Sequence, residues 1–295
     1  MDTLHSIAQL RLALDPVRRS SQRIAVVPTM GNLHEGHLSL VEKALELADI
    51  VVATIFVNPM QFGANEDLDN YPRTLSEDQE KLQAAGCHLL FAPNTREIYP
   101  EGLEGHSVVH VPVISELHCG ASRAGHFDGV TTVVCKLLNI VQPDIAVFGL
   151  KDYQQFQVVR KMIDDLCLAV ELIGVETRRD NNGLALSSRN GYLDEIEKDR
   201  ATRIYGILRE IRSAIEAGRH DYRELEADAR TRLAESGLTP DYFAICHAQT
   251  LQPANRNDDE LIILTAAWVK QTRLIDNIRV SLRGNQPTGD VHVHQ

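Results

Sequence analysis

Short runs of β-branched residues alternate with helical repeats over the first two-thirds of the chain, and this alternation constrains the fold most strongly. Each apolar run that predicts a buried strand is followed by apolar residues at helical spacing, which is the order of βαβ units. The pattern predicts an α/β fold with a Rossmann-like, doubly wound parallel sheet of at least five strands. The expected strands are 24–27, 50–57, 89–91, 145–148 and 169–175.

The pattern changes after about residue 186, which predicts a second, smaller α+β domain. Isoleucine recurs at helical spacing behind an Asp194 N-cap, so a long amphipathic helix is expected there, followed by a charged helix. Strands are expected at 242–246 and 261–269, with 277–282 as the candidate third. The predicted organisation is a Rossmann-like domain at 1–185, an α+β domain at 186–283 and a disordered tail at 284–295.

The charge balance restricts the class of ligand. Lys and Arg number 30 and Asp and Glu number 41, and the net charge of −11 opposes binding to nucleic acid or to an anionic membrane. Any small anion therefore needs a local site. The five cysteines form no CxxC pair and indicate reduced thiols. With no secretory signal and no apolar run of bilayer length, the sequence predicts a cytoplasmic protein.

One predicted strand-to-helix turn carries the run Pro28-Thr29-Met30-Gly31-Asn32-Leu33-His34-Glu35-Gly36-His37. Open α/β sheets bind ligands at such a turn, where the N-terminus of a helix favours an anion. Gly31 and Gly36 would let a phosphate or a base approach the backbone, and His34 and His37 could donate to phosphate oxygens. A chance surface pair and a zinc pair are the alternatives, although further zinc ligands are not evident. The position favours a nucleotide.

Three further segments carry polar groups suited to a nucleotide or an organic acid. Lys151 follows a predicted strand as a point cation. Residues 187–189 place two serines and an arginine together, as a loop that grips a triphosphate would. Asn58 and Gln61 offer uncharged amides that suit a small polar acid.

These runs, in this order, resemble the pantoate–β-alanine ligase family. The motifs are Pro-Thr-Met-Gly-Asn-Leu-His-Glu-Gly-His, Phe-Val-Asn-Pro-Met-Gln-Phe, Gly-x-Lys-Asp-Tyr-Gln-Gln and Leu-Ser-Ser-Arg-Asn-Gly-Tyr-Leu, with His-Phe-Asp-Gly-Val-Thr-Thr-Val-Val at 126–134. The resemblance covers about residues 24 to 282. The histidine motif alone would indicate only the wider nucleotidyltransferase superfamily.

The resemblance implies a ligase that condenses (R)-pantoate with β-alanine to pantothenate, in the biosynthesis of coenzyme A. ATP would activate pantoate as pantoyl adenylate with release of pyrophosphate, and β-alanine would then displace AMP. Magnesium is expected with ATP, and the enzyme is expected to be a homodimer. A nucleotidyltransferase that stops at the adenylated product and an inactive nucleotide-binding scaffold are the alternative functions.

The resemblance also assigns roles to individual residues. The expected catalytic residues are His37, as the principal histidine, His34 and Lys151. Pantoate and β-alanine would be held by Asn58, Gln61 and Gln155. Thr29 would help to shape the nucleotide pocket. The expected ATP-binding residues are Met30, Gly31, Asn32, Leu33, His34, Glu35, Gly36, His37, Gly149, Leu150, Lys151, Asp152, Arg178, Leu186, Ser187, Ser188 and Arg189.

Some positions are left open by the sequence. The family commonly has an acidic residue in place of Leu150 and a small apolar residue in place of Arg178. Glu77 and Asp78 lie near acidic metal ligands of some members, but a solvated helix start is the favoured interpretation. The stretch 106–126, with four histidines and Arg123, is compatible with a lid or with an ordinary loop.

Overall fold

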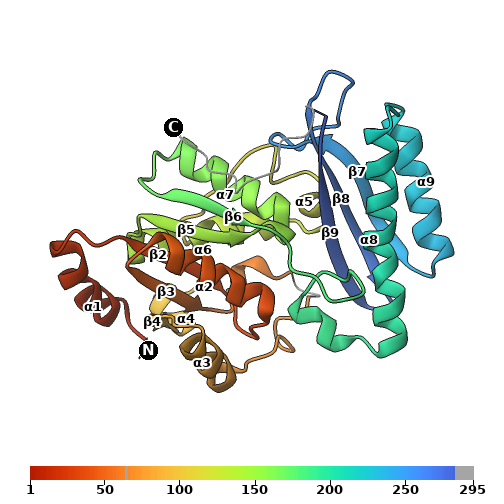
Figure 1. Ribbon diagram of the computed structural model, residues 1–295. Coiled ribbons are helices and arrows are strands. Elements are labelled where there is room, and N and C mark those ends of the chain that lie inside the picture. The colour runs from red at the N-terminus through yellow and green to blue at the C-terminus, as the bar shows by residue number, and fades with distance from the viewer. Residues whose placement is uncertain (64–65, 283–295) are drawn as a thin grey trace.

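The computed structural model describes residues 1–63 and 66–282, and its larger sheet has the predicted doubly wound topology (Figure 1). Its strands are β1 (Asp2–Leu4), β2 (Ile24–Thr29), β3 (Ile50–Ile55), β4 (Leu89–Phe91), β5 (Ile145–Gly149) and β6 (Glu171–Val175). All six are parallel, in the order β1-β4-β3-β2-β5-β6. From β2 the chain runs outward through β3 and β4, then returns to place β5 on the other side of β2. The strand order therefore reverses between β2 and β5.

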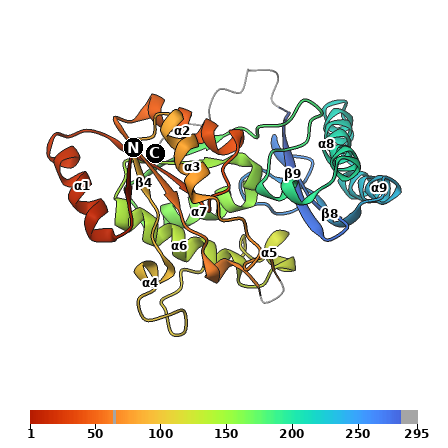
Figure 2. The ribbon, with the colours of Figure 1, turned by 90° about the horizontal axis from the view of Figure 1, so that it is seen from below.

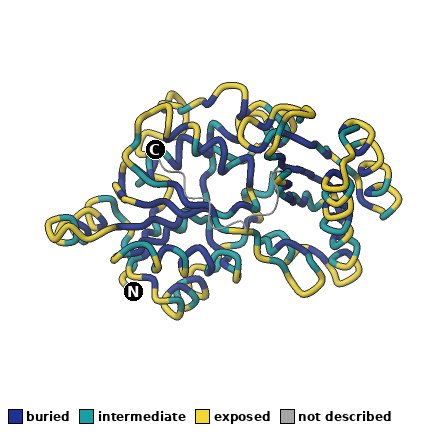
Figure 3. The backbone as a smooth tube through the Cα atoms, turned by 45° about the horizontal axis from the view of Figure 1, so that its top comes forward, coloured by how far each residue is buried: buried dark blue, intermediate teal, exposed yellow. Residues whose placement is uncertain are grey.

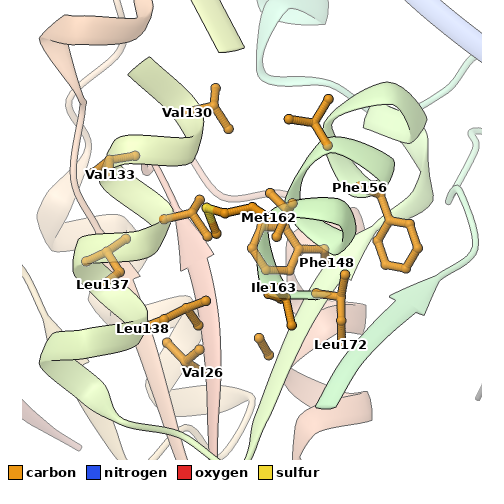
Figure 4. Close-up of a cluster of buried hydrophobic side chains, with 14 of the residues drawn as sticks. Val26, Val130, Val133, Leu137, Leu138, Phe148, Phe156, Met162, Ile163 and Leu172 are labelled. Carbon is orange, nitrogen blue, oxygen red and sulfur yellow. The ribbon is translucent and has the colours of Figure 1, made fainter. Parts of the chain in front are cut away.

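Helices cover both faces of this sheet because successive strand residues, apolar on both sides, point to opposite faces. Ala25 and Val27 of β2 belong to one buried cluster with α2 and α3, whereas Val26 belongs to another with α1, α6 and α7 (Figure 2). Figure 4 shows Val26 and Phe148 among side chains of α6 and α7. The helices are α1 (Ile7–Arg19), α2 (Glu35–Leu47), α3 (Leu75–Ala84), α6 (His126–Val141) and α7 (Tyr153–Asp165).

One strand of the sheet was not predicted from the sequence. β1 pairs in parallel with β4, at the edge of the sheet. It consists of Asp2, Thr3 and Leu4, and three residues with one apolar side chain give no periodicity to detect. Two predicted strands are also shorter than expected, since β3 ends at Ile55 and β6 begins at Glu171.

The C-terminal part forms the expected smaller α+β unit. Asp194 caps α8 through the backbone N–H of Glu197, whose carboxylate accepts the N–H of Asp194 in return. The third strand begins earlier than predicted and pairs along its length with the second. The elements are α8 (Glu195–Glu216), α9 (Tyr222–Glu235), and the antiparallel strands β7 (Thr239–His247), β8 (Glu260–Val269) and β9 (Thr272–Ser281).

The smaller sheet is buried on both faces, which explains the apolar run in its central strand. Leu261 and Ile263 of β8 pack with α8 and α9, whereas Ile262 and Leu264 join the core of the larger sheet. Figure 3 shows buried strands between the exposed outer turns of the two helices and the rest of the molecule. The smaller unit is thus packed onto the larger one by its sheet.

A charged pair reinforces this junction. Arg179, which follows β6, donates two hydrogen bonds of 2.6 and 2.8 Å to Asp276 of β9 and stacks on the ring of Tyr205.

The predicted boundary near residue 185 stays a prediction, and the predicted tail at 284–295 lies outside the described residues. No described helix combines the length and the apolar character needed to cross a bilayer.

Candidate active site

The turns after β2 and β5 meet at the point where the strand order reverses, and a cavity of about 220 Å³ opens there. Ligands of open α/β sheets bind at this position. The structure therefore brings together most of the residues predicted from the sequence. Those that line the cavity are Thr29, Met30, His34, Gly36, His37, Gln61, Gly149, Lys151, Asp152, Gln155, Arg178, Leu186, Ser187, Ser188 and Arg189.

Asp78 of α3 holds the turn that leads into α2. Gly31 and Asn32 both have positive φ, of 88° and 52°, and this left-handed turn exposes successive backbone N–H groups. The carboxylate of Asp78 accepts the N–H of Asn32 at 2.8 Å and the N–H of Leu33 at 2.7 Å. Lys81, three residues further along α3, donates to the carbonyl of Leu33 at 2.8 Å.

The favoured interpretation of a solvated helix start is therefore wrong for Asp78, which is fully buried. Glu77, on the adjacent position of the helix, is exposed as expected. Sequence reasoning missed Asp78 and Lys81 as supports of the turn. Their spacing of three residues, on one face of a helix, is the signal that could have indicated a shared target.

His34 and His37 cap the N-terminus of α2 with their own rings. Nδ1 of His34 accepts the backbone N–H of Gly36 at 3.1 Å, and Nδ1 of His37 accepts the backbone N–H of His34 at 3.3 Å. A ring nitrogen that accepts an N–H bond carries no proton, so each neutral ring holds its proton on Nε2. Both rings thus keep one N–H donor for a ligand.

The environment keeps these two rings neutral. Burial, together with the nearby His34 and Lys151, lowers the pKa of His37 to about 3. Burial and the charge of Lys151 lower the pKa of His34 to about 4. At neutral pH the pair therefore offers two uncharged donors rather than two cations.

The two glycines of the motif make room for protein groups. A Cβ on Gly31 would lie 3.1 Å from the carboxylate of Asp78. A Cβ on Gly36 would lie 2.9 Å from the ring of His34, so a larger residue there would displace the capping ring. Both glycines thus serve the geometry of the turn, and the close approach of a phosphate or a base stays a prediction.

Lys151 is the cation of the second turn. It lies on a short 3-10 turn, η2 (Leu150–Asp152), between β5 and α7, and its Nζ is 3.9 Å from the carboxylate of Asp152. The side chain amide of Asn277, on β9, donates 2.9 Å hydrogen bonds to the carbonyls of Leu150 and Lys151. The smaller sheet therefore helps to fix the position of the lysine.

The loop at 187–189 is tied to the first turn. Ser188 donates to the carbonyl of Asn32 at 3.2 Å, and Ser187 caps its own short turn by accepting the N–H of Arg189. The guanidinium of Arg189 pairs with Asp67 at 3.0 Å. The serines and the arginine thus lie beside the histidine turn, although they are far from it in the sequence.

The predicted substrate amides have different surroundings. Asn58 is 1% exposed and does not line the cavity. Its Nδ2 donates to Gly129 at 3.0 Å and to Gln61 Oε1 at 3.2 Å, while its Oδ1 accepts from Tyr99 at 2.7 Å. Its hydrogen-bonding groups are all used within the protein. Gln61 and Gln155 both reach the cavity wall.

Some predicted ATP-binding residues lie outside the cavity wall. The side chain of Leu150 is buried in the core, so the acidic residue common at this position in the family has no counterpart facing the cavity. Arg178 is exposed on the wall, and its backbone carbonyl accepts the N–H of Leu186. The predicted residues absent from the wall are Gly31, Asn32, Leu33, Glu35 and Leu150.

Acidic side chains are sparse around the cavity, which bears on the expected magnesium. In the part of the chain that the structure describes, no three His, Cys, Asp or Glu side chains gather in a way that could hold a metal ion. Both carboxylate oxygens of Asp78 accept backbone N–H groups, and Glu77 is exposed. Asp152 is the predicted site residue that keeps a partly exposed carboxylate on the cavity wall.

A second cavity, of about 760 Å³, lies between the starts of α6 and α7 and the smaller sheet. It shares Lys151, Asp152, Gln155, Ser187 and Arg189 with the first cavity. Lys151 and Arg189 therefore lie at the boundary between the smaller cavity and the wider cleft.

Replacement of Asp78 by Asn tests its role in holding the turn. The amide keeps one acceptor oxygen but points an N–H₂ group at a backbone N–H, and we expect a loss of about 2–4 kcal/mol in the free energy of unfolding, measured by denaturant titration. Glu77→Gln is the matched control and should leave stability unchanged. An Asp78→Asn protein as stable as the wild type would contradict the structural role.

The low pKa of His37 predicts a loss of stability in mild acid. Between about pH 6.5 and 5 the unfolded chain binds a proton at this residue that the folded protein does not bind. The free energy of unfolding should therefore decrease as the pH is lowered, by about 1.4 kcal/mol per pH unit for each such proton. In His37→Asn, which keeps an acceptor for the N–H of His34, the slope should be shallower by about one proton. Equal slopes would contradict the neutral state of His37.

Comparison with known proteins identifies the family of this chain. A model of the family described as pantoate-beta-alanine ligase matches residues 2–279. The pantothenate synthetase of Marinobacter nauticus is 58% identical to this chain, over 95% of the chain and 100% of the relative. The pantothenate synthetase of Pseudomonas aeruginosa is 55% identical, over 96% of the chain and 100% of the relative.

Solved structures of similar proteins have the same fold. The crystal structure of pantothenate synthetase from Thermus thermophilus has a TM-score of 0.88 and 43% identity, over 94% of this chain and 99% of that one. The pantoate-beta-alanine ligase from Francisella tularensis, complexed with beta-gamma ATP and beta-alanine, has a TM-score of 0.76 and 34% identity, over 94% and 97% of the two chains. The resemblance seen in the motifs is confirmed: the chain belongs to the pantoate–β-alanine ligase family.

Proposed function

We propose that the protein condenses pantoate with β-alanine in two steps, of which the first consumes ATP. The observation that carries this proposal is the cavity between β2 and β5, where two neutral histidine donors and Lys151 lie beside the uncharged amides of Gln61 and Gln155. Such a site suits a polyphosphate next to a small hydroxy acid. The Francisella relative was solved with an ATP compound and β-alanine, which supports the same substrates here.

In the first step, a carboxylate oxygen of pantoate attacks the α-phosphorus of ATP. A new O–P bond forms, the bond from the α-phosphorus to the bridging oxygen breaks, and pyrophosphate leaves with that electron pair. In the second step, the amine of β-alanine attacks the acyl carbon, the C–O bond to the phosphate breaks, and AMP leaves as the amine loses a proton. Activation is needed because a free carboxylate would have to expel an oxide ion, whereas pantoyl adenylate expels AMP.

The side chains supply position and charge. The Nε2–H groups of His34 and His37 donate to phosphate oxygens, which gain negative charge in the transition state. Lys151 neutralises that charge as a point cation, and the loop at 187–189 adds two hydroxyls and a guanidinium. Holding two anions together in the correct orientation supplies much of the remaining rate enhancement.

The amides hold the organic acid. Gln61 and Gln155 bind the hydroxyls and the carboxylate of pantoate, and Gln61 also contacts β-alanine. Asn58 acts through Gln61, because its Nδ2 fixes the side chain oxygen of that residue and its own groups are already used. This role replaces the direct contact expected from the resemblance.

Magnesium enters this proposal as part of the substrate. The ion binds phosphate oxygens and keeps several waters, so MgATP needs few protein ligands. Asp152, whose partly exposed carboxylate lies on the cavity wall, would accept hydrogen bonds from those waters. The predicted homodimer stays a prediction. So does the cytoplasmic location, which suits an enzyme that consumes ATP.

The decisive experiment is ATP-dependent release of AMP and pyrophosphate, with pantoate and β-alanine omitted in turn. We expect AMP and pantothenate only when both are present, and pyrophosphate release with bound adenylate when β-alanine is omitted. A stable nucleotide ester formed without any need for an amine would favour a nucleotidyltransferase. No turnover would favour an inactive nucleotide-binding scaffold.

Lys151→Ala should lower the rate of adenylate formation by roughly 10²–10³, the effect of losing one preorganised charge donor. Pre-steady-state release of pyrophosphate measures this step. Lys161→Ala, which removes an exposed lysine paired with Asp165 on α7, is the matched control and should retain the wild-type rate. A Lys151→Ala protein with near-normal adenylate formation would refute the role of the lysine.

A further inference from the structure

A third histidine, outside the turn that carries His34 and His37, contacts the backbone of Gln61. His126 is the first residue of α6, in the stretch that the sequence left open between lid and loop. Its Nδ1 lies 2.8 Å from the carbonyl oxygen of Gln61, and its Nε2 lies 2.9 Å from Nη1 of Arg123. Neither residue has a part in the reaction described above.

The chemistry of these contacts fixes the proton on the ring. A carbonyl oxygen only accepts, so Nδ1 of His126 must donate, and a guanidinium only donates, so Nε2 must accept. Both contacts are satisfied by the neutral Nδ1–H form alone. Burial and the charge of Arg123 lower the pKa of His126 to about 4, which agrees with this form. Its proton lies on the ring nitrogen opposite to that of His34 and His37.

Arg123 is itself held on the other side. Its Nε and Nη2 donate to the two carboxylate oxygens of Glu66 at 2.6 Å each, and Nη2 also lies 3.4 Å from the carbonyl of Gln61. Such a bidentate pair fixes the plane of the guanidinium. The chain of contacts therefore runs from Glu66 through Arg123 and His126 to the backbone of Gln61.

The same backbone is clamped by α6. A Cβ on Gly129 would lie 2.4 Å from the carbonyl oxygen of Met60 and 2.6 Å from the backbone nitrogen of Gln61, so the helix touches the strand-end turn directly. One helical turn before Gly129, His126 reaches the same segment. The backbone of Gln61 is thus held by α6, while Asn58 holds its side-chain oxygen.

We propose that His126, oriented by Arg123, is a positioning residue that aims Gln61 at the organic acid. The inference rests on the proposed function, in which Gln61 binds pantoate. Within the stretch 106–126, Arg123 and His126 would then serve the binding of pantoate. Losing the hydrogen bond to the Gln61 carbonyl should weaken binding of pantoate without weakening binding of ATP.

Two amide variants separate the contacts of His126. His126→Asn places an amide nitrogen near the position of Nδ1 and retains a donor for the Gln61 carbonyl, whereas His126→Gln places its amide near Nε2 and loses that donor. We expect KM for pantoate to rise roughly tenfold in His126→Gln and to stay near the wild-type value in His126→Asn, with KM for ATP unchanged in both. The exposed His110, which pairs with Asp128, gives the control His110→Asn.

The wild-type assay keeps the two proposals distinguishable. Absence of pantoate-dependent AMP release by the wild-type protein would overturn the proposed function. With that activity present, an unchanged KM for pantoate in His126→Gln, or an equal rise in both amide variants, would overturn the positioning role alone. If His126→Gln fails to fold, Arg123→Lys, which keeps the charge facing Glu66 but cannot keep the fork geometry, should show the same selective rise in KM for pantoate. A normal KM there would likewise overturn the role.

Discussion

The carboxylate of Asp78 is the contact on which the site depends. Asn32 has a positive φ although it is not a glycine, and this conformation is less favourable for a residue with a side chain. The buried carboxylate compensates by accepting two N–H groups of the turn. The turn in turn fixes where α2 begins, and the start of α2 determines which nitrogen atoms of His34 and His37 are engaged. A residue of a neighbouring helix thereby controls which donors face the ligand.

The sequence predicted the regular parts of the fold well, because buried strands and amphipathic helices leave strong periodic signals. It missed β1, which is held in place only by pairing with β4 and has no periodicity of its own. It also placed the start of the third C-terminal strand too late in the chain. Thr272 and Arg273 are polar, and they join the strand because β8 offers them hydrogen-bonding partners.

The motifs located most of the site, but they could not distinguish residues that reach the cavity from residues that hold those in place. In the sequence, Asn58 and Gln61 are both amides near a strand end. In the structure, Asn58 bonds to Gly129 and Tyr99, whereas Gln61 reaches the cavity. Asp78 and Glu77 read alike as acids at a helix start, yet one is buried and one is exposed. The difference depends on which face of the helix meets the turn before α2, and this is a tertiary property. Asn277 is a further example, since it reaches Lys151 from the other sheet.

The cationic side chains of the cleft already have carboxylate partners within the protein, and this affects which anions can bind there. Arg189 holds Asp67, Arg123 holds Glu66 from the adjacent position of the chain, and Lys151 lies near Asp152. An anion that binds Arg189 must therefore displace the carboxylate of Asp67, because the guanidinium is already paired. A small monovalent ion that offers one contact gains little from such an exchange. A molecule that presents several oxygens to several of these groups at once can displace the internal partners, so an acidic protein can select a polyphosphate and ignore the abundant simple salts around it.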